Sequence, residues 1–515
     1  MIKDGVVVDG TGQPRYQADI AIKQDKIVDI GKFDDTAAKY IDAENLIVAP
    51  GFIDIHSHGE LSILVNPSAS SKIYQGITTE VTGNCGSSIT PLSGRMVTKV
   101  KERLADYQLP LKWKTTQDYF EILRQNKSAI NLVTLIGHGL LRQTVVGYQK
   151  REATDIELER MKVMLAQALE EGAYGLSTGL IYPPSSYAST EELIALAKVV
   201  ANYDGIYTTH LRSEGDQLVA AVEEAIIIAQ QANVKVQISH HKAIGQQNWG
   251  KVNQTLQLIT QARERGLDVS CDFYPYLATS TGLSALLPEW VFGGQKEEVI
   301  ARIKENQQQI LNYLNQERSR QDGWEQIIIA EAKKHKDYEG LNMDEVAKKL
   351  NQQPAEVAIE LLITENLSTS MIKFSVSEAD LRQVLQADFS MVGTDAISRV
   401  KDTILANSHC HPRTYGSFPR VIDRYVSSAL ISLERAIKKM TYLPAKKLGL
   451  QRGLIKPDYF ADLVVFDLKR IKDCATYSDP HRYAVGVEHL VVNGSLVLKG
   501  GKQLSNLPGY VLTNN

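Results

Sequence analysis

The sequence predicts an α/β fold, a (β/α)8 TIM-type barrel with a small β-sandwich domain built from both chain termini and an inserted lid segment. Three observations support this prediction. Short strand-like runs broken by Gly and Asp occupy both ends of the 515-residue chain. Between them, apolar runs alternate with helical stretches, which is typical of successive βα units. One stretch within that alternation is too long to be a simple connection.

The first predicted domain combines residues 1–50 with residues 445–515. Strand-like runs in the first fifty residues suggest a small antiparallel sheet. The C-terminal part contains runs of the same kind, so we infer that both ends build one sandwich-like domain into which the rest of the chain is inserted. These runs are 5–8, 19–22, 26–31, 461–467, 490–494 and 496–501.

Residues 51–444 form the predicted barrel. Eight apolar runs are candidate strands, and eight is the number that closes a (β/α)8 barrel. A ninth run, 371–376, is ambiguous and stays outside the count. Helical periodicity is clear in 155–171, 190–203, 215–231 and 252–265. The candidate strands end near His56, Gly83, Gly137, Thr178, His210, His240, Phe273 and Asp395.

The stretch from about 284 to 370 is too long for a connection between a strand and a helix. It contains its own Gln- and Glu-rich helical material, such as 295–318. Insertions of this kind usually form a lid or a small cap over the barrel mouth. We therefore expect this segment to cover the mouth and to help select the substrate.

Composition narrows the expected function to small-molecule chemistry. The chain is 43% hydrophobic with a formal net charge of -3 and has no dense Lys/Arg block. We therefore expect a large core and neither a nucleic acid nor a membrane surface as partner. No apolar run approaches the roughly 18 residues needed to cross a bilayer. Nothing in the sequence indicates an oligomeric state.

The cysteines and the N-terminus bear on the cellular compartment. Cys85, Cys271, Cys410 and Cys474 do not form a disulfide pattern and fit a reducing compartment. The chain begins in a strand-like run at 6–8, without the basic region and apolar core of a signal peptide. We expect a cytoplasmic protein, although a chain that had lost a leader peptide would begin in the same way.

A metal site is predicted at the strand ends, beginning with His56 and His58. In an extended segment, side chains two residues apart point the same way, so both imidazoles would face one side. Taken alone, such a pair is more often surface or hydrogen-bonded histidine. However, Cys85, His210, His240 and Asp395 follow other candidate strands, and the carboxyl ends of barrel strands open onto one face.

These six side chains offer the nitrogen, sulfur and oxygen donors that zinc prefers. Their number exceeds that of a closed structural site, which indicates an open catalytic site with one metal or with two metals that share a ligand. Cys85 could be the shared ligand, because a metal deprotonates a coordinating thiol. Each residue alone has a plainer interpretation as core filling or a helix cap, but six donors on five of eight strand ends are hard to explain that way.

Further motifs run through almost all of the chain, at 50–58, 83–86, 175–184, 209–214, 238–242, 272–276, 393–395 and 411–420. In these motifs the chain resembles the amidohydrolase superfamily and, within it, the N-acyl-D-amino-acid deacylases, also called D-aminoacylases. The His-x-His element marks only the superfamily. The Asn-Cys-Gly, Ser-His-His-Lys and His-Pro-Arg-x-Tyr-Gly elements are far more selective.

This resemblance implies a zinc-dependent enzyme that hydrolyses the amide bond of N-acyl-D-amino acids to a carboxylate and a free D-amino acid. One zinc would be tightly held, and a second position would be weaker or sometimes empty. Asp395 would take a proton from the attacking water and pass it to the leaving nitrogen. The implied tight ligands are Cys85, His210 and His240, and the second position is surrounded by His56, His58 and Asp395.

The same resemblance gives five candidate side chains for contact with the substrate. Arg and Lys pair with an α-carboxylate, and a Tyr hydroxyl can orient that group or the acyl oxygen. The five candidates are Tyr182, Lys242, Arg413 and, as alternatives to each other, Tyr274 or Tyr276.

Other polar residues near the strand ends suit supporting roles. Asp272 could orient a ligand histidine, and Arg212 could pair with Glu214 to brace His210. His241 would point away from the metal, and His138 suits either a supporting or a structural role.

Two other classes of function stay open. One is another amidohydrolase, either a cyclic amidase of the dihydroorotase or hydantoinase kind or a D-peptidase. The other is a catalytically inactive barrel that serves as a scaffold. Cys85 on the second strand, in place of a bridging lysine on the fourth, argues against the cyclic amidases. A scaffold predicts missing ligands, and all six are present.

Overall fold

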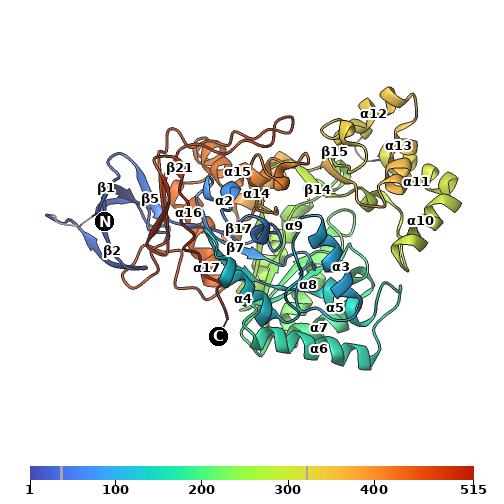
Figure 1. The fold of residues 1–515 in the computed structure, drawn as a ribbon, viewed down its shortest axis with the longest axis horizontal. Helices are drawn as coiled ribbons and strands as arrows, with labels where there is room; N and C mark the ends of the chain where they lie inside the picture. The colour runs from blue at the N-terminus through green and yellow to red at the C-terminus, as the bar shows by residue number, and fades with distance from the viewer. Residues whose placement is uncertain (35–38, 321–322, 515) are drawn as a thin grey trace.

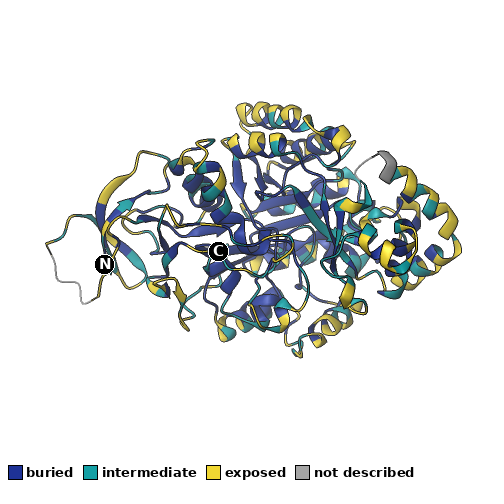
Figure 2. Ribbon diagram, turned by 90° about the horizontal axis from the view of Figure 1, so that it is seen from above, coloured by how far each residue is buried: buried dark blue, intermediate teal, exposed yellow. Residues whose placement is uncertain are grey.

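The computed structural model describes residues 1–34, 39–320 and 323–514, and the molecule is elongated (Figure 1). A sheet made from both ends of the chain lies at one end of the molecule. Parallel strands with their helices occupy the middle, and the insertion lies at the other end. Buried residues concentrate in the strands and on the inner faces of the helices (Figure 2).

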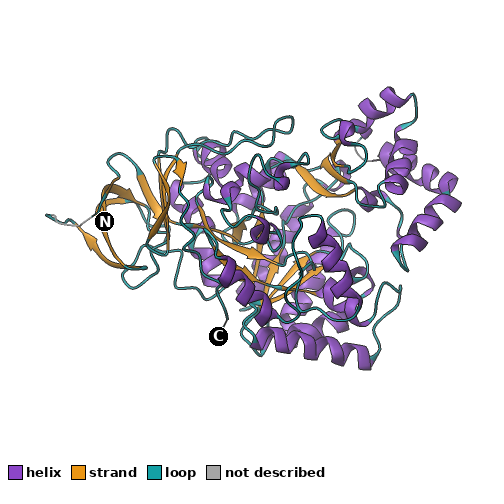
Figure 3. Cartoon of the chain, viewed as in Figure 1, coloured by secondary structure: helices purple, strands orange, loops and turns teal. Residues whose placement is uncertain are grey.

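The terminal sheet has nine strands in the order β21-β20-β19-β18-β5-β1-β2-β3, with β4 beside β1 (Figure 3). Buried side chains from both ends of the chain pack into one cluster, so the two termini share a core. The bounds are β1 Ile2–Val7, β2 Tyr16–Lys23, β3 Lys26–Gly31, β4 Ile41–Asp42, β5 Ile47–Pro50, β18 Leu463–Phe466, β19 Val487–Val492, β20 Ser495–Lys499 and β21 Lys502–Gln503.

One expectation for this sheet is wrong. The first fifty residues do not form a purely antiparallel sheet, because β1 is antiparallel to β2 but parallel to both β4 and β5. The chain between β3 and β5 is long enough to cross back to the far side of β1, and such a crossover produces parallel pairing. Turn signals mark only the short hairpins, so they did not reveal this pairing.

The middle of the chain contains two parallel arrays, β6-β7-β8 and β9-β10-β11-β12-β13-β17. Leu135 alone separates β8 from β9, and the Asp395 N–H donates to the His56 carbonyl at 2.8 Å, so the arrays meet at both edges. The eight predicted strands are present, and the one that ends near Gly137 is divided into β8 and β9. Their bounds are β6 Phe52–Asp54, β7 Ile77–Thr82, β8 Asn131–Thr134, β9 Ile136–Gly137, β10 Gly175–Gly179, β11 Ile206–His210, β12 Lys235–Ile238, β13 Val269–Phe273 and β17 Ser390–Val392.

Helices follow most of these strands, and the four predicted from periodicity are α6 to α9. The Thr154 hydroxyl accepts the Glu157 N–H at the start of α6, in a reciprocal cap that fixes where the helix begins. Among the described residues, no helix is long and apolar enough to cross a bilayer. The bounds are α1 Ser62–Val65, α2 Ser70–Ile73, α3 Arg95–Ala105, α4 Thr116–Asn126, α5 His138–Val145, α6 Asp155–Glu170, α7 Thr190–Ala201, α8 Leu218–Ala232, α9 Lys251–Glu264, α14 Glu378–Gln386, α15 Arg413–Arg420, α16 Leu433–Met440 and α17 Tyr442–Lys447.

The insertion folds around its own hydrophobic cluster. It contains a three-stranded antiparallel sheet in the order β14-β16-β15, so it begins before residue 284 and ends after residue 370. The ambiguous run at 371–376 belongs mainly to β16, outside the parallel arrays. The bounds are β14 Ala278–Gly282, α10 Lys296–Glu305, α11 Gln307–Arg320, β15 Ile327–Glu331, α12 Met343–Leu350, α13 Pro354–Thr364 and β16 Ser370–Phe374.

The last described residues leave the terminal sheet and run along β8. The Gly509 N–H donates to Ser128 O at 2.7 Å, and Leu132 exchanges hydrogen bonds with Tyr510 O and the Leu512 N–H, both at 2.9 Å. This segment therefore differs from the predicted domain assignment, which placed all of 445–515 in the terminal domain. Its carbonyls and amides instead pair with a parallel strand.

Removal of residues 508–515 is expected to destabilise the protein. The truncation exposes Leu132 and leaves its N–H and carbonyl without these partners, and each lost hydrogen bond costs about 1 kcal/mol. Differential scanning fluorimetry of the truncated and full chains should show an apparent melting temperature lowered by several degrees. An unchanged melting temperature would mean that the tail adds nothing to stability.

Candidate metal centre

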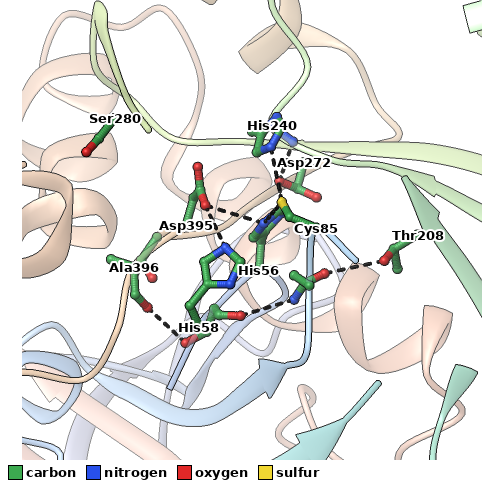
Figure 4. Close-up of polar contacts among 12 residues, drawn as sticks. His56, His58, Cys85, Thr208, His240, Asp272, Ser280, Asp395 and Ala396 are labelled. Atoms are coloured by element: carbon green, nitrogen blue, oxygen red, sulfur yellow. Dashed lines mark hydrogen bonds and ion pairs between the residues drawn. The ribbon is translucent and has the colours of Figure 1, made fainter. Parts of the chain in front are cut away.

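Six side chains from five strand ends converge on one point. Figure 4 shows five of them, namely His56, His58, Cys85, His240 and Asp395. The six form two groups in which the candidate ligand atoms all lie within 4.8 Å of one another, and both groups include Cys85. The groups are Cys85, His210 and His240, and His56, His58, Cys85 and Asp395. The structure thus brings together all six donors predicted from the sequence.

Unusual backbone conformations aim three of these side chains. Cys85, His240 and Asp395 have φ values of 52°, 36° and 47°, in the left-handed region that L-residues rarely adopt. At Gly83, where φ is 82°, a Cβ atom would lie 2.1 Å from Leu135 O. Only glycine fits there, so the turn that delivers Cys85 needs this glycine. Strained conformations of this kind cluster at functional sites.

The Cys85 thiol lies at the centre of the cluster. Its Sγ is 3.3 Å from His56 Nε2 and 3.4 Å from His240 Nε2. Burial by itself raises the pKa of the thiol, but the neighbouring His56 and His240 outweigh burial and hold that pKa well below its usual range. Cys85 is therefore poised as a thiolate, the form that binds metal.

The Asp395 carboxylate faces both histidines of the His-x-His pair. Its Oδ1 lies 3.1 Å from His58 Nε2 and 3.5 Å from His56 Nε2. Although burial opposes protonation, the bond to Asp395 raises the pKa of His58 to about 10. The pocket thus favours positive charge, which suits a cation as well as a proton.

His210 provides the sharpest test of whether a metal fits. Its ring is 5% exposed, and neither ring nitrogen has a hydrogen-bond partner within the described part of the chain. Its ring centroid lies 4.4 Å from that of His240. Burial of an imidazole that has no hydrogen-bond partner costs free energy. A metal ion bound to His210 would offset that cost. Together with a thiolate and a second imidazole, this donor set fits zinc.

Carboxylates behind the ligands hold two of the histidine rings. His56 Nδ1 lies 3.1 Å from Asp272 Oδ1, which confirms the expected support by Asp272. His240 Nδ1 lies 2.8 Å from Glu214 Oε1. Such contacts fix the tautomer and leave the other ring nitrogen to face the metal.

The predicted pairing of Arg212 with Glu214 is wrong. Arg212 instead forms a two-pronged ion pair with Glu224 of α8, with nitrogen–oxygen distances of 3.0 and 2.9 Å. Glu224 lies on α8, the helix that follows β11 in the chain, and a forked guanidinium fits its carboxylate. Glu214 is thereby free to support His240.

The two histidines expected in supporting or structural roles, His138 and His241, have structural partners. His241 points away from the cluster, as expected, and its Nε2 lies 2.8 Å from Thr255 Oγ1. His138 is fully buried between Ser185 Oγ at 3.0 Å and Glu192 Oε1 at 2.9 Å. His138 therefore holds the chain near 185 in place and does not reach the cluster.

Three of the predicted substrate residues border the cluster. Arg413 Nη1 forms an ion pair with Asp395 Oδ2 at 2.8 Å, without the alignment of a hydrogen bond. The Arg413 guanidinium stacks 4.5 Å from the Tyr274 ring centroid. Tyr182 lies 5.1 Å from His210 between ring centroids, and its hydroxyl meets Thr281 Oγ1 of β14 at 2.9 Å. The insertion thus reaches the edge of the site.

The side chains of the other two predicted substrate residues bind protein partners. Lys242 Nζ lies 2.5 Å from Glu214 Oε1 and donates to His240 O at 2.8 Å. The Tyr276 hydroxyl donates to Asp473 Oδ2 at 2.8 Å, away from the ligands. Lys242 is therefore adjacent to the cluster as a neighbour of His240, whereas Tyr276 supports the surrounding wall.

This chain is similar to several known proteins over almost its whole length. A D-aminoacylase from Alcaligenes xylosoxydans xylosoxydans is 36% identical over 500 residues, which cover 96% of this chain and 94% of that protein. The crystal structure of N-acyl-D-glutamate deacylase from Bordetella bronchiseptica, complexed with zinc and a phosphonate mimic of the tetrahedral intermediate, has a TM-score of 0.84 at 34% identity and covers 99% and 98% of the two chains. A D-aminoacylase with a binuclear metal center, described by one-metal activation and second-metal attenuation, has a TM-score of 0.84 at 33% identity and covers 99% of both chains.

Parallel strands with cysteine, histidine and aspartate donors at their carboxyl ends fit the class of metal-dependent hydrolases. The Amidohydrolase family matches residues 39–498 of this chain. The chain belongs to the amidohydrolase family and, within it, to the N-acyl-D-amino-acid deacylases, or D-aminoacylases.

Proposed function

We propose that this chain is a zinc-dependent hydrolase that cleaves the amide bond of N-acyl-D-amino acids to a carboxylate and a free D-amino acid. The observation that carries the proposal is the unpartnered His210 beside Cys85 and His240, with Asp395 and Arg413 next to them. A zinc-bound relative that acts on an N-acyl-D-amino acid supports the same reaction. The expected partner is a small molecule.

In this proposal Cys85, His210 and His240 hold the tight zinc. His56, His58 and Asp395 surround a second, weaker position that shares Cys85. Zinc supplies a Lewis acid that polarises the acyl oxygen and lowers the pKa of water toward about 7. Asp272 and Glu214 keep His56 and His240 in orientation through their ring nitrogens.

Asp395 is the proposed proton carrier. It takes the proton of the attacking water and passes it to the leaving nitrogen. Burial by itself raises the pKa of Asp395, but Arg413 and His56 hold that pKa well below its usual range. A substrate carboxylate bound to Arg413 would offset the guanidinium charge and raise the pKa of Asp395, which makes it a better base.

Arg413 is the proposed anchor for the α-carboxylate of the substrate. Its guanidinium can bind both carboxylate oxygens while it stacks on the Tyr274 ring. Lys242 and Tyr182 border the same space and complete the proposed substrate contacts. Tyr276 supports the wall of the site through its hydrogen bond to Asp473. A fixed carboxylate determines which face of the amide meets the water, and so selects the D configuration.

We also propose the domain organisation predicted above. Residues 51–444 form a closed (β/α)8 barrel, because hydrogen bonds join the two parallel arrays at both edges. Residues 1–50 and 445–515 form the β-sandwich domain, except for the tail along β8. The insertion acts as a lid, as the contact between Thr281 and Tyr182 suggests.

The alternatives are less well supported. A cyclic amidase or D-peptidase would share the fold, but 36% identity to a D-aminoacylase over nearly the whole chain favours a linear N-acyl amide. An inactive scaffold offers no explanation for a buried imidazole without partners.

A substrate panel tests the proposal. Purified zinc-loaded protein should release amino acid from N-acetyl-D-amino acids much faster than from their L enantiomers, because only one configuration aligns the amide while the carboxylate is held. The ninhydrin reaction or chiral chromatography measures the release. Hydantoins and D-dipeptides serve as comparison substrates. Equal rates for both enantiomers would reject the stereochemical proposal, and faster hydrolysis of hydantoins would favour a cyclic amidase.

A further inference from the structure

A lysine is fully buried beneath the strand ends that carry the His-x-His pair and Asp395. Lys72 lies on α2 with none of its side chain exposed. Its three N–H groups are shared among four oxygens within hydrogen-bond distance of Nζ, namely Asp54 Oδ2 at 2.7 Å, Thr394 Oγ1 at 2.8 Å, Ser57 Oγ at 3.1 Å and Ala396 O at 3.1 Å. One ammonium group therefore binds two segments that are far apart in the sequence.

These contacts bracket the functional side chains. Asp54 and Ser57 flank His56, and Thr394 and Ala396 flank Asp395. Asp54 Oδ1 also accepts the backbone N–H of Thr394 at 2.8 Å. These hydrogen bonds thus join the end of β6, which carries His56, to the end of β17, which carries Asp395.

The energetics indicate that Lys72 contributes to the geometry of the site. Burial of an ammonium is costly, and here Asp54 at 2.7 Å and Glu80 at 3.5 Å offset the cost. Apolar residues often replace a buried ion pair without loss of stability. Apolar residues could not form hydrogen bonds to the residues on both sides of Asp395. Such bonds matter because the φ of Asp395 is 47°, which is unfavourable for an aspartate.

We propose that Lys72 is a positioning residue that fixes the Asp395 carboxylate beside His56 and His58. The inference rests on the proposed role of Asp395 as the proton carrier. Lys72 itself touches neither the candidate ligand atoms nor the space next to Arg413. It acts through Thr394, Ala396 and the carboxylate of Asp54.

Lys72→Met tests this inference, with Lys439→Met as the matched control. Lys439 is also buried and donates to Ser390 Oγ at 3.1 Å, at the opposite end of β17. A misplaced catalytic group can cost about 10²-fold in rate. We expect Lys72→Met to lower kcat by about that factor with little change in KM and with the tight zinc retained. Lys439→Met should lower the melting temperature yet leave kcat per folded molecule near the parent value.

Lys72→Met made in the Asp395→Asn variant distinguishes loss of Asp395 positioning from general damage to the fold. If Lys72 acts through Asp395, Lys72→Met should cost about 10²-fold in the parent chain and almost nothing once Asp395 is Asn, because the two effects are then not additive. Equal losses in both backgrounds, or equal kcat for Lys72→Met and Lys439→Met, would overturn the inference. Full activity of Asp395→Asn alone would instead refute the proposed role of Asp395 as the proton carrier, and failure of the parent chain to hydrolyse any N-acyl-D-amino acid would refute the proposed function.

Thr394→Val provides a second measurement if Lys72→Met does not fold. The substitution keeps the side-chain shape but removes the hydroxyl that joins Lys72 to Asp54 Oδ2, at 2.8 and 2.6 Å. We expect a smaller loss of kcat that again disappears in the Asp395→Asn background. An unchanged kcat would contradict the inference.

Discussion

Replacement of Asp395 by Asn is expected to lower kcat by about 10²–10⁴-fold, the usual contribution of a general base and acid. Asparagine keeps the shape of the side chain but cannot accept the proton of the attacking water. The tight zinc should remain, since Cys85, His210 and His240 form a group of their own. Steady-state kinetics and zinc analysis of the same preparation measure both effects.

Asp268→Asn is a suitable control for this experiment. Asp268 also pairs with a buried cation, Lys447, at 2.9 Å, but it precedes β13 at the end of the strands far from the cluster. Its loss should reduce stability without a large change in kcat. If Asp395→Asn retained full turnover, another group would have to carry the proton.

Replacement of Cys85 by Ala is expected to remove zinc and abolish activity. Both groups of candidate ligands contain this sulfur, so its loss weakens both positions at once. Without the thiolate, His56 and His240 also lose the anionic neighbour that lies 3.3 and 3.4 Å away. Metal analysis by inductively coupled plasma mass spectrometry should show a chain with little or no zinc after dialysis.

Cys271→Ala provides the matched control. Cys271 is fully buried, lies within β13 and belongs to neither candidate group. Its replacement creates a small cavity and should lower stability by about 1 kcal/mol per methylene-sized group lost, with zinc content unchanged. Retention of a full zinc complement by Cys85→Ala would show that Cys85 is not a ligand.

The parallel strands could be predicted because most of them are short runs that contain β-branched residues and lie just before a glycine or a polar residue. The limits of the insertion were harder to predict. Its first strand, β14, consists of Ala, Thr, Ser and Gly, so it lacks the apolar alternation that marks a strand. The β16 run was recognisable, but an apolar run does not reveal which sheet it joins.

The metal donors could also be predicted, because strand ends in a parallel array converge whatever the loops do. Their supports could not. Arg212 pairs with Glu224 across a turn, and Lys72 reaches Thr394 across more than half the chain. Spacing along the sequence carries no information about such contacts, since they depend on how helices pack against the sheet.

The two ends of the insertion lie side by side. Ala278 at the start of β14 faces Phe374 at the end of β16, and the segment between them has its own core. A unit with adjacent ends can be exchanged between homologues, or lengthened during evolution, while the barrel keeps its geometry. Selectivity for the amino-acid side chain could therefore diversify by replacement of a cassette, independently of the residues that perform the chemistry.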